Sequence, residues 1–134
     1  MVNLPSIKTV LVSNAVFSGI GGAALLVAPK ALANFFGTIP LWVSVAMGVG
    51  LVLFSIGVFW TALDQKRIRQ HLNIIFSADC AWVVLTPIAI ILFNQRLSFW
   101  GTMLLVEIAF IVAIFSFLER QHIKLFEENG WPSR

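Results

Sequence analysis

Four long runs of apolar residues follow one another along the chain, separated by short polar segments. A helix needs roughly 20 apolar residues to cross a hydrocarbon layer about 30 Å thick, and each run reaches that length. The segments between the runs contain prolines or clusters of charged and amide residues, which interrupt apolar helices. We therefore predict four transmembrane helices and a cytoplasmic tail, at about residues 8–28, 40–63, 72–93, 97–118 and 119–134.

The runs lack the polar stripe that a soluble four-helix bundle shows at a spacing of about 3.6 residues. Composition agrees, since 59% of the 134 residues are hydrophobic and only 11% are charged. The sequence therefore predicts an all-α membrane protein. We expect a single integral domain over 1–134, folded as a four-transmembrane-helix bundle in contact with membrane lipid.

Basic residues are distributed unequally between the two sides of the predicted spans. With four spans, the N-terminus, the second connection and the tail share one side, which carries seven Lys and Arg, whereas the other side carries two. Cytoplasmic segments hold such an excess, so both termini are predicted to be cytoplasmic, in a bacterial inner (plasma) membrane. The seven are Lys8, Lys66, Arg67, Arg69, Arg120, Lys124 and Arg134, and the two are Lys30 and Arg96.

The formal net charge of +3 raises the question of a nucleic-acid partner. The basic residues form short clusters beside apolar runs, where membrane proteins carry them, rather than a continuous basic face. No nucleic-acid partner is expected.

A second interpretation of the first run stays open. Residues 31–33 (Ala-Leu-Ala) resemble a signal-peptidase site that follows an apolar segment. The uncharged stretch from Thr9 to Pro29 is longer than the ~7 to 15 residues of a usual signal core, which favours a retained helix.

Small residues recur on the first two predicted helices. Ala15, Gly19 and Ala23 stand four residues apart, and Gly48 follows Ser44 at the same spacing. Lipid gives helices no hydrophobic reason to associate, so close approach at small residues has to stabilise their contact. The abundance of glycine in membrane helices explains any one of these residues, but the spaced series predicts a helix contact.

A duplicated helical hairpin is a further interpretation. The second and fourth spans both end in Leu and an acid, at 63–64 and 118–119, and the odd-numbered spans carry Asn14 and Asp79. The two offsets differ, at 65 residues for the polar pair and 55 for the acids. Two tandem hairpins and chance similarity both account for this pattern.

Two charge-capable side chains, Asp79 and Glu107, interrupt the predicted spans. Ionisable residues inside a span are costly, usually face the bundle interior and mark candidate functional sites. With a rise of about 1.5 Å per residue, Asn14 and Ser55 fall in the same slab of the membrane. Side chains lean toward the N-terminus of their own helix, so we expect Asn14 beside Asp79, and Ser55 nearer Glu107. These four residues are the predicted buried polar or ion site.

Trp82 and Thr86 extend this site along the third span. Pro87 cannot donate a backbone hydrogen bond, so it frees a carbonyl close to Asp79, and the Thr86 hydroxyl offers a replacement donor. Trp82 shares a face with Asp79. We predict both residues as the wall of a pocket, with simple packing as the alternative for Trp82.

Residues for several chemistries are missing from the sequence. No lysine stands inside a span to hold retinal, Cys80 is the sole cysteine, and Glu119-x-x-His122 supplies only half of a carboxylate di-iron motif. We therefore predict no cofactor, no metal and no enzymatic activity, with a lipid-modifying activity left open.

Two functions from different classes remain. Buried carboxyl groups without a basic neighbour are expected to hold protons, and such groups can release a proton or exchange it for a cation. The first interpretation is therefore proton- or cation-linked transport by a small multi-pass protein, as a homo-oligomer or a subunit of a membrane complex. The second is a non-catalytic accessory or scaffold protein whose polar layer only holds the bundle together.

Overall fold

Five helices make up most of residues 3–131, the part of the chain that the computed structural model describes. Four of them are long and apolar enough to cross a membrane, as expected for an all-α integral membrane protein. The fifth, α2, is a short helix that the sequence did not predict. The helices are α1 (Ile7–Val27), α2 (Pro29–Phe36), α3 (Leu41–Ala62), α4 (Gln65–Leu92) and α5 (Phe99–Asn129).

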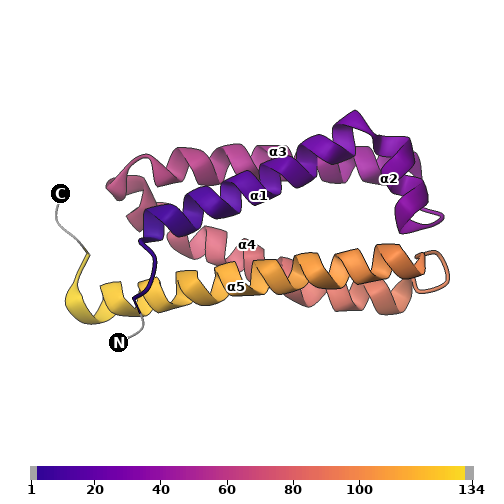
Figure 1. Ribbon diagram of the computed structural model, residues 1–134. Helices are drawn as coiled ribbons and strands as arrows, with labels where there is room; N and C mark the ends of the chain where they lie inside the picture. Colours follow the sequence, from indigo (N-terminus) through magenta and orange to yellow (C-terminus); the bar gives the residue numbers. More distant parts are fainter. Residues whose placement is uncertain (1–2, 132–134) are drawn as a thin grey trace.

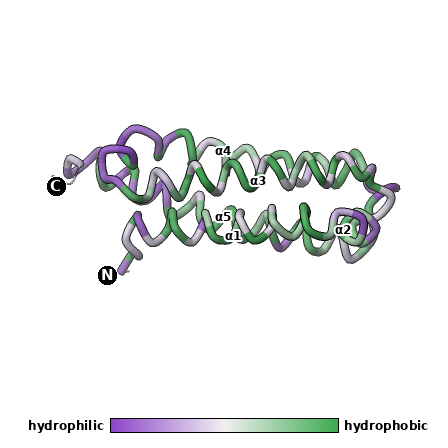
Figure 2. The backbone as a smooth tube through the Cα atoms, turned by 90° about the horizontal axis from the view of Figure 1, so that it is seen from above, coloured by the Kyte–Doolittle hydropathy of each residue, from purple (hydrophilic) through white to green (hydrophobic). Residues whose placement is uncertain are grey.

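The four long helices run alternately up and down one bundle, so α1 begins and α5 finishes at the same end (Figure 1). α1 packs along α3, α4 packs along α5, and α2 lies at the opposite end. Hydrophobic residues cover the length of the bundle, whereas hydrophilic ones gather at its ends, mostly where α5 finishes (Figure 2). We name this the basic end, because Lys8, Lys66, Arg67, Arg69, Arg120 and Lys124 lie toward it.

Two helices extend beyond their predicted limits. α4 begins at Gln65 rather than near 72. Asp64 caps its N-terminus, because the Asp64 side chain accepts a hydrogen bond from the Lys66 amide at 3.1 Å. α5 continues to Asn129, through most of the predicted tail. Lys, Arg, Gln and Glu are good helix formers, so charged residues mark the edge of an apolar run without ending the helix. Residues 132–134 of the predicted tail, with Arg134, lie outside the described residues.

The backbones of α1 and α3 approach most closely at Gly22. A Cβ atom on this residue would lie 2.9 Å from the Gly48 carbonyl oxygen and 2.9 Å from the Val52 amide nitrogen. One turn earlier, a Cβ on Gly19 would lie 2.7 Å from the Ser55 hydroxyl. Small residues therefore set the distance between these two helices, as expected for packing in lipid.

The predicted series of small residues matches this contact only in part. Ala15, Gly19 and Gly48 lie between α1 and α3, but Ala23 is exposed and Gly22 takes its place. A strict spacing of four residues drifts by about 40° per step around a helix of 3.6 residues per turn. Alternating steps of four and three residues stay on the contact face.

At the end opposite the basic end, the connection after α2 is tied to the connection between α4 and α5. The Thr38 amide donates to the Arg96 carbonyl at 2.8 Å, and the Ser98 amide donates to the Phe36 carbonyl at 2.7 Å. Between these bonds Gly37 has a φ of 135°, a conformation that side chains with a Cβ rarely adopt. This tie joins the first part of the chain to the last at a point distant from the basic end.

The buried apolar side chains gather in the half of the bundle nearer the basic end. Leu11, Ile68 and Leu72 are among the largest that are fully enclosed. The cluster around them joins α1, α3, α4 and α5, and it contains Ile7, Val10, Leu11, Ala15, Val58, Ala62, Ile68, Leu72, Ile75 and Ile123.

The close contact at Gly22 predicts that Gly22→Ala destabilises the bundle by about 1 to 3 kcal/mol, because the added methyl group meets backbone atoms of α3 that cannot rotate away. Denaturation of the purified protein in detergent micelles, followed by circular dichroism, measures the effect. Gly21→Ala is the matched control, since its Cβ would have only an ordinary contact, 3.9 Å from Leu51. Equal stability of the two variants would contradict the assignment.

Candidate functional site

The side-chain amide of Asn14 joins two carboxyl groups inside the bundle. Its nitrogen Nδ2 donates to Oδ2 of Asp79 at 2.5 Å and to Oε1 of Glu119 at 3.3 Å. The hydroxyl of Ser18 donates in turn to Oδ1, the side-chain oxygen of Asn14, at 3.3 Å. One amide on α1 therefore uses both of its N–H groups to hold acids from α4 and α5. We name Asn14, Asp79 and Glu119 the carboxyl cluster.

Helix geometry brings the three residues to one level. Asn14 lies about two turns after the start of α1, Asp79 about four turns after the start of α4, and Glu119 about three turns before the end of α5. Asn14 and Glu119 are nearer the basic end of their helices, and Asp79 is near the middle of α4.

The carboxyl cluster is enclosed by protein. Asn14 and Glu119 are 0% exposed and Asp79 is 4% exposed. Among the described residues, the one ion pair joins Arg67 to Asp64 at 4.0 Å, on the surface, so no basic side chain compensates the buried acids. Two carboxyl groups that share one amide in an apolar interior are an unusual and costly arrangement.

Three buried polar atoms near this level of the bundle have no hydrogen-bond partner among the described residues. They are Oε2 of Glu119, the hydroxyl oxygen of Ser116 and Nε1 of Trp82. Ser116 precedes Glu119 by one turn on α5, and Trp82 follows Asp79 by one turn on α4, so both lie on the side of the carboxyl cluster away from the basic end. Together they offer hydroxyl and indole donors and one carboxyl acceptor.

The prediction that Glu107 is buried is wrong. Glu107 is exposed on the outer face of α5, in a stripe with Met103, Phe110 and Ile114. The buried face of the same helix passes instead through Val112, Ser116, Glu119 and Ile123. The depth of a residue along a helix does not determine the direction in which its side chain points around the helix axis. Glu107 points away from the interior of the bundle.

Ser55 is half-buried and takes no part in the carboxyl cluster. Its hydroxyl donates to the Ala15 carbonyl of α1 at 2.6 Å, so it joins α1 to α3 one residue from Asn14. The predicted neighbourhood of Ser55 and Glu107 does not occur, whereas the predicted neighbourhood of Asn14 and Asp79 does.

Trp82 and Thr86 line neither the hollow beside Val106 and Phe110 on α5 nor the hollow between α3 and α4. Thr86 is buried, and its hydroxyl donates to the Trp82 carbonyl at 2.7 Å, one residue before the carbonyl that Pro87 frees. The pocket with these two walls stays a prediction, and the indole nitrogen of Trp82 is buried without a hydrogen-bond partner among the described residues.

Glu119 is the member that the sequence did not place in the site. We predicted the fourth span to end just before it, because a run of charged residues begins there. The missed signal is a spacing of four, three and four residues through Val112, Ser116, Glu119 and Ile123, which continues one helix face into the charged segment.

His122 lies one turn from Glu119, nearer the basic end. It is 8% exposed, and its Nε2 is 2.8 Å from the Pro5 carbonyl oxygen, which makes Nε2 the donor in that bond. Across residues 3–131 no group of three or more His, Cys, Asp or Glu side chains is arranged to hold a metal ion. The contact to Pro5 attaches the segment before α1 to α5.

Comparison of the chain with protein-family models, with curated proteins and with solved structures finds no match. The arrangement of side chains is therefore the basis for a functional proposal.

The shared amide predicts that Asn14→Ala lowers the free energy of unfolding by about 1 to 3 kcal/mol, because it leaves two buried carboxyl groups without their common donor. Asn34→Ala on exposed α2 is the matched control and should change stability by less than about 0.5 kcal/mol. Chemical denaturation in micelles measures both variants. Similar values for the two would show that the amide contributes nothing to the fold.

Proposed function

We propose that this protein is a small multi-pass membrane protein that carries out proton- or cation-linked transport through the carboxyl cluster. The observation that carries the proposal is the Asn14 amide shared by two enclosed acids from different helices, neither of which forms an ion pair with a described residue. Intramembrane carboxyl groups of this kind typically mark ion pathways and proton relays.

The chemistry follows from the shared donor. Asn14 donates to both carboxyl groups, so it holds both in position whichever of them carries a proton. Oε2 of Glu119 remains as an acceptor for a transferred proton or a small cation, and the Ser116 hydroxyl lies one turn away on the same helix. Loss of the last proton places two negative charges in an apolar interior, which opposes the closed arrangement and favours movement of the helices.

The orientation is also part of the proposal. The basic end holds most of the Lys and Arg, and an excess of these residues is characteristic of the cytoplasmic side. We place the basic end, and with it both termini, in the cytoplasm of a bacterial cell with an inner membrane. Asn14 and Glu119 then lie in the cytoplasmic half of their helices, and Asp79 lies near the middle of α4.

Assembly into a homo-oligomer or a larger membrane complex is supported by Glu107. Its carboxyl group lies about two turns into α5, among exposed apolar side chains, with no hydrogen bond or ion pair to another described residue. A carboxyl group facing lipid at this depth is costly, and a second protein surface with a hydrogen-bonding group relieves the cost.

A non-catalytic scaffold is the second candidate. The cluster links α1 to the consecutive helices α4 and α5, and none of its members lines the hollow on α5 or the one between α3 and α4. A polar layer that only specifies packing has the same contacts, so a measurement of flux has to distinguish the two functions.

Transport predicts that Asp79→Asn and Glu119→Gln each lower proton or cation flux at least about tenfold in proteoliposomes driven by a membrane potential, because the neutral side chains cannot exchange a proton. A pH-sensitive dye inside the vesicles measures proton flux, and sodium- and potassium-sensitive dyes measure the cations. Glu107→Gln is the matched control: it neutralises a carboxyl group on the same helix but outside the bundle, and it should leave the flux unchanged.

If the folded wild-type protein moves none of these ions faster than protein-free vesicles, the transport proposal fails and the scaffold function stands. Flux that is equal in wild type, Asp79→Asn and Glu119→Gln also rejects a role for the carboxyl cluster.

Association through Glu107 predicts different behaviour for two substitutions. Glu107→Gln keeps a hydrogen-bonding group and should retain the oligomer, whereas Glu107→Leu should shift the protein toward the monomer by about one order of magnitude in dissociation constant. Analytical ultracentrifugation in detergent measures this shift. An unchanged oligomer in Glu107→Leu, or a wild-type monomer at all concentrations, would reject the proposed interface.

A further inference from the structure

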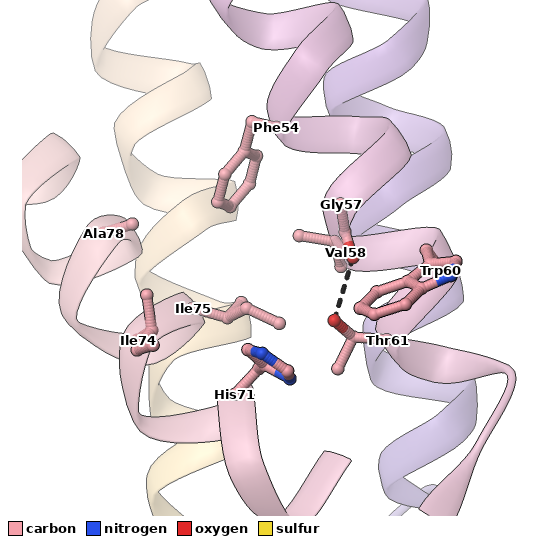
Figure 3. A pocket seen from close by; sticks show the side chains of 9 residues that line it. All are labelled: Phe54, Gly57, Val58, Trp60, Thr61, His71, Ile74, Ile75 and Ala78. Atoms are coloured by element: carbon pink, nitrogen blue, oxygen red, sulfur yellow. Dashed lines mark hydrogen bonds between the residues drawn. The ribbon is translucent and has the colours of Figure 1, made fainter. Parts of the chain in front are cut away.

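The pairing of α3 with α4 differs from the pairing of α1 with α3. α3 and α4 are consecutive helices, yet a cavity of about 280 Å³ lies between them, close to their connection (Figure 3). The cavity extends from Phe54 and Ala78 toward Thr61 and His71. We name this cavity the α3–α4 groove.

The α3–α4 groove opens to the outside of the bundle. Gly57, Ile74 and Ala78 line it and are exposed, so in a membrane the groove faces the acyl chains of the surrounding lipid. Gly57 provides no side chain, and a Cβ atom there would meet no heavy atom within 4 Å. The absence of a side chain at this position keeps the groove open.

The chemistry of the α3–α4 groove changes along its length. Phe54, Val58 and Ile75 make the part distant from the connection apolar. At the other end Trp60, Thr61 and His71 provide aromatic and polar groups, and Figure 3 shows the His71 ring directed into the space between the two helices. An apolar channel with a polar, aromatic mouth matches the division of a phospholipid into acyl chain and headgroup.

Positive charge lies beside the polar mouth. The Arg67 guanidinium stacks 4.0 Å from the centroid of the Trp60 ring and donates to the Trp60 carbonyl at 3.1 Å. Lys66 and Arg69 are exposed on the same first turns of α4, and the one acid between residues 64 and 71 is Asp64, which pairs with Arg67 at 4.0 Å. The net positive charge of this segment complements a phosphate group.

We propose that the α3–α4 groove binds an anionic phospholipid. One acyl chain lies along Phe54, Val58 and Ile75, and the phosphate lies at the mouth beside Arg67 and His71. This site is independent of the carboxyl cluster and of the proposed transport, because none of its lining residues belongs to that cluster.

Retention of lipid by the intact protein tests the proposal. The protein is reconstituted into vesicles of equal parts phosphatidylglycerol and phosphatidylcholine with the same acyl chains. It is then released from the vesicles, and native mass spectrometry measures the mass of the protein with its retained lipids. We expect retained phosphatidylglycerol in preference to phosphatidylcholine. Gly57→Leu should lower retention about tenfold, because the new side chain occupies the groove. Gly50→Leu is the matched control, since Gly50 is equally open on the same helix but does not line the groove.

The headgroup is tested separately by Arg67→Gln. This variant should lower the preference for phosphatidylglycerol about fivefold, the factor that one basic side chain near a membrane surface contributes. Arg96→Gln, at the opposite end of the bundle, should leave the preference unchanged.

Photo-crosslinking of the wild-type protein avoids dependence on the folding of any variant. A phosphatidylglycerol with a photoreactive group in its acyl chain should label α3 and α4 around Phe54 and Ile74. Labels confined to α1 or α5, equal retention in wild type and Gly57→Leu, or equal retention of the two lipids would overturn the proposal. A lipid-free dimer that Gly57→Leu dissociates would also overturn it, by showing a second copy in the groove.

Discussion

The side-chain amide of Asn14 is the contact on which the interior of the bundle depends. Its two N–H groups hold Asp79 and Glu119, which form no ion pair with a described residue and have almost no access to water. Acids in such a place are tolerated when they are hydrogen-bonded, and their removal from the donor is costly. The relative rotation of α1, α4 and α5 is therefore set by the requirement that three polar side chains meet in an otherwise apolar core.

The helices around this point pack unequally. Glycines let the backbones of α1 and α3 touch near Gly22, so that pair resists separation along much of its length. The contact between α3 and α4 contains a groove instead, although the two helices are neighbours in the chain. The bundle therefore has closely packed backbones between α1 and α3, and an open cavity between α3 and α4.

The number of long apolar helices, their approximate positions and the pairing of Asn14 with Asp79 could be predicted from the sequence, because run length and side-chain lean along a helix are local properties. The choice between Glu107 and Glu119 could not. It depends on the direction of each carboxyl around α5 and on the continuation of that helix past the first charged residues. The exposed position of Ala23 has the same origin, since the residues that face a partner are set by helix rotation, which only packing decides.

The order of the three residues along the chain determines when the carboxyl cluster can form during synthesis. Asn14 and Asp79 are 65 residues apart in sequence, and Asn14 and Glu119 are 105 residues apart. Glu119 is the last of the three to be synthesised, so the hydrogen-bond network cannot be complete before most of α5 has been made. A chain interrupted before α5 keeps an incomplete hydrogen-bond network and an uncovered face of α4. Completion of most of α5 is thus required before the three helices can share one hydrogen-bond network.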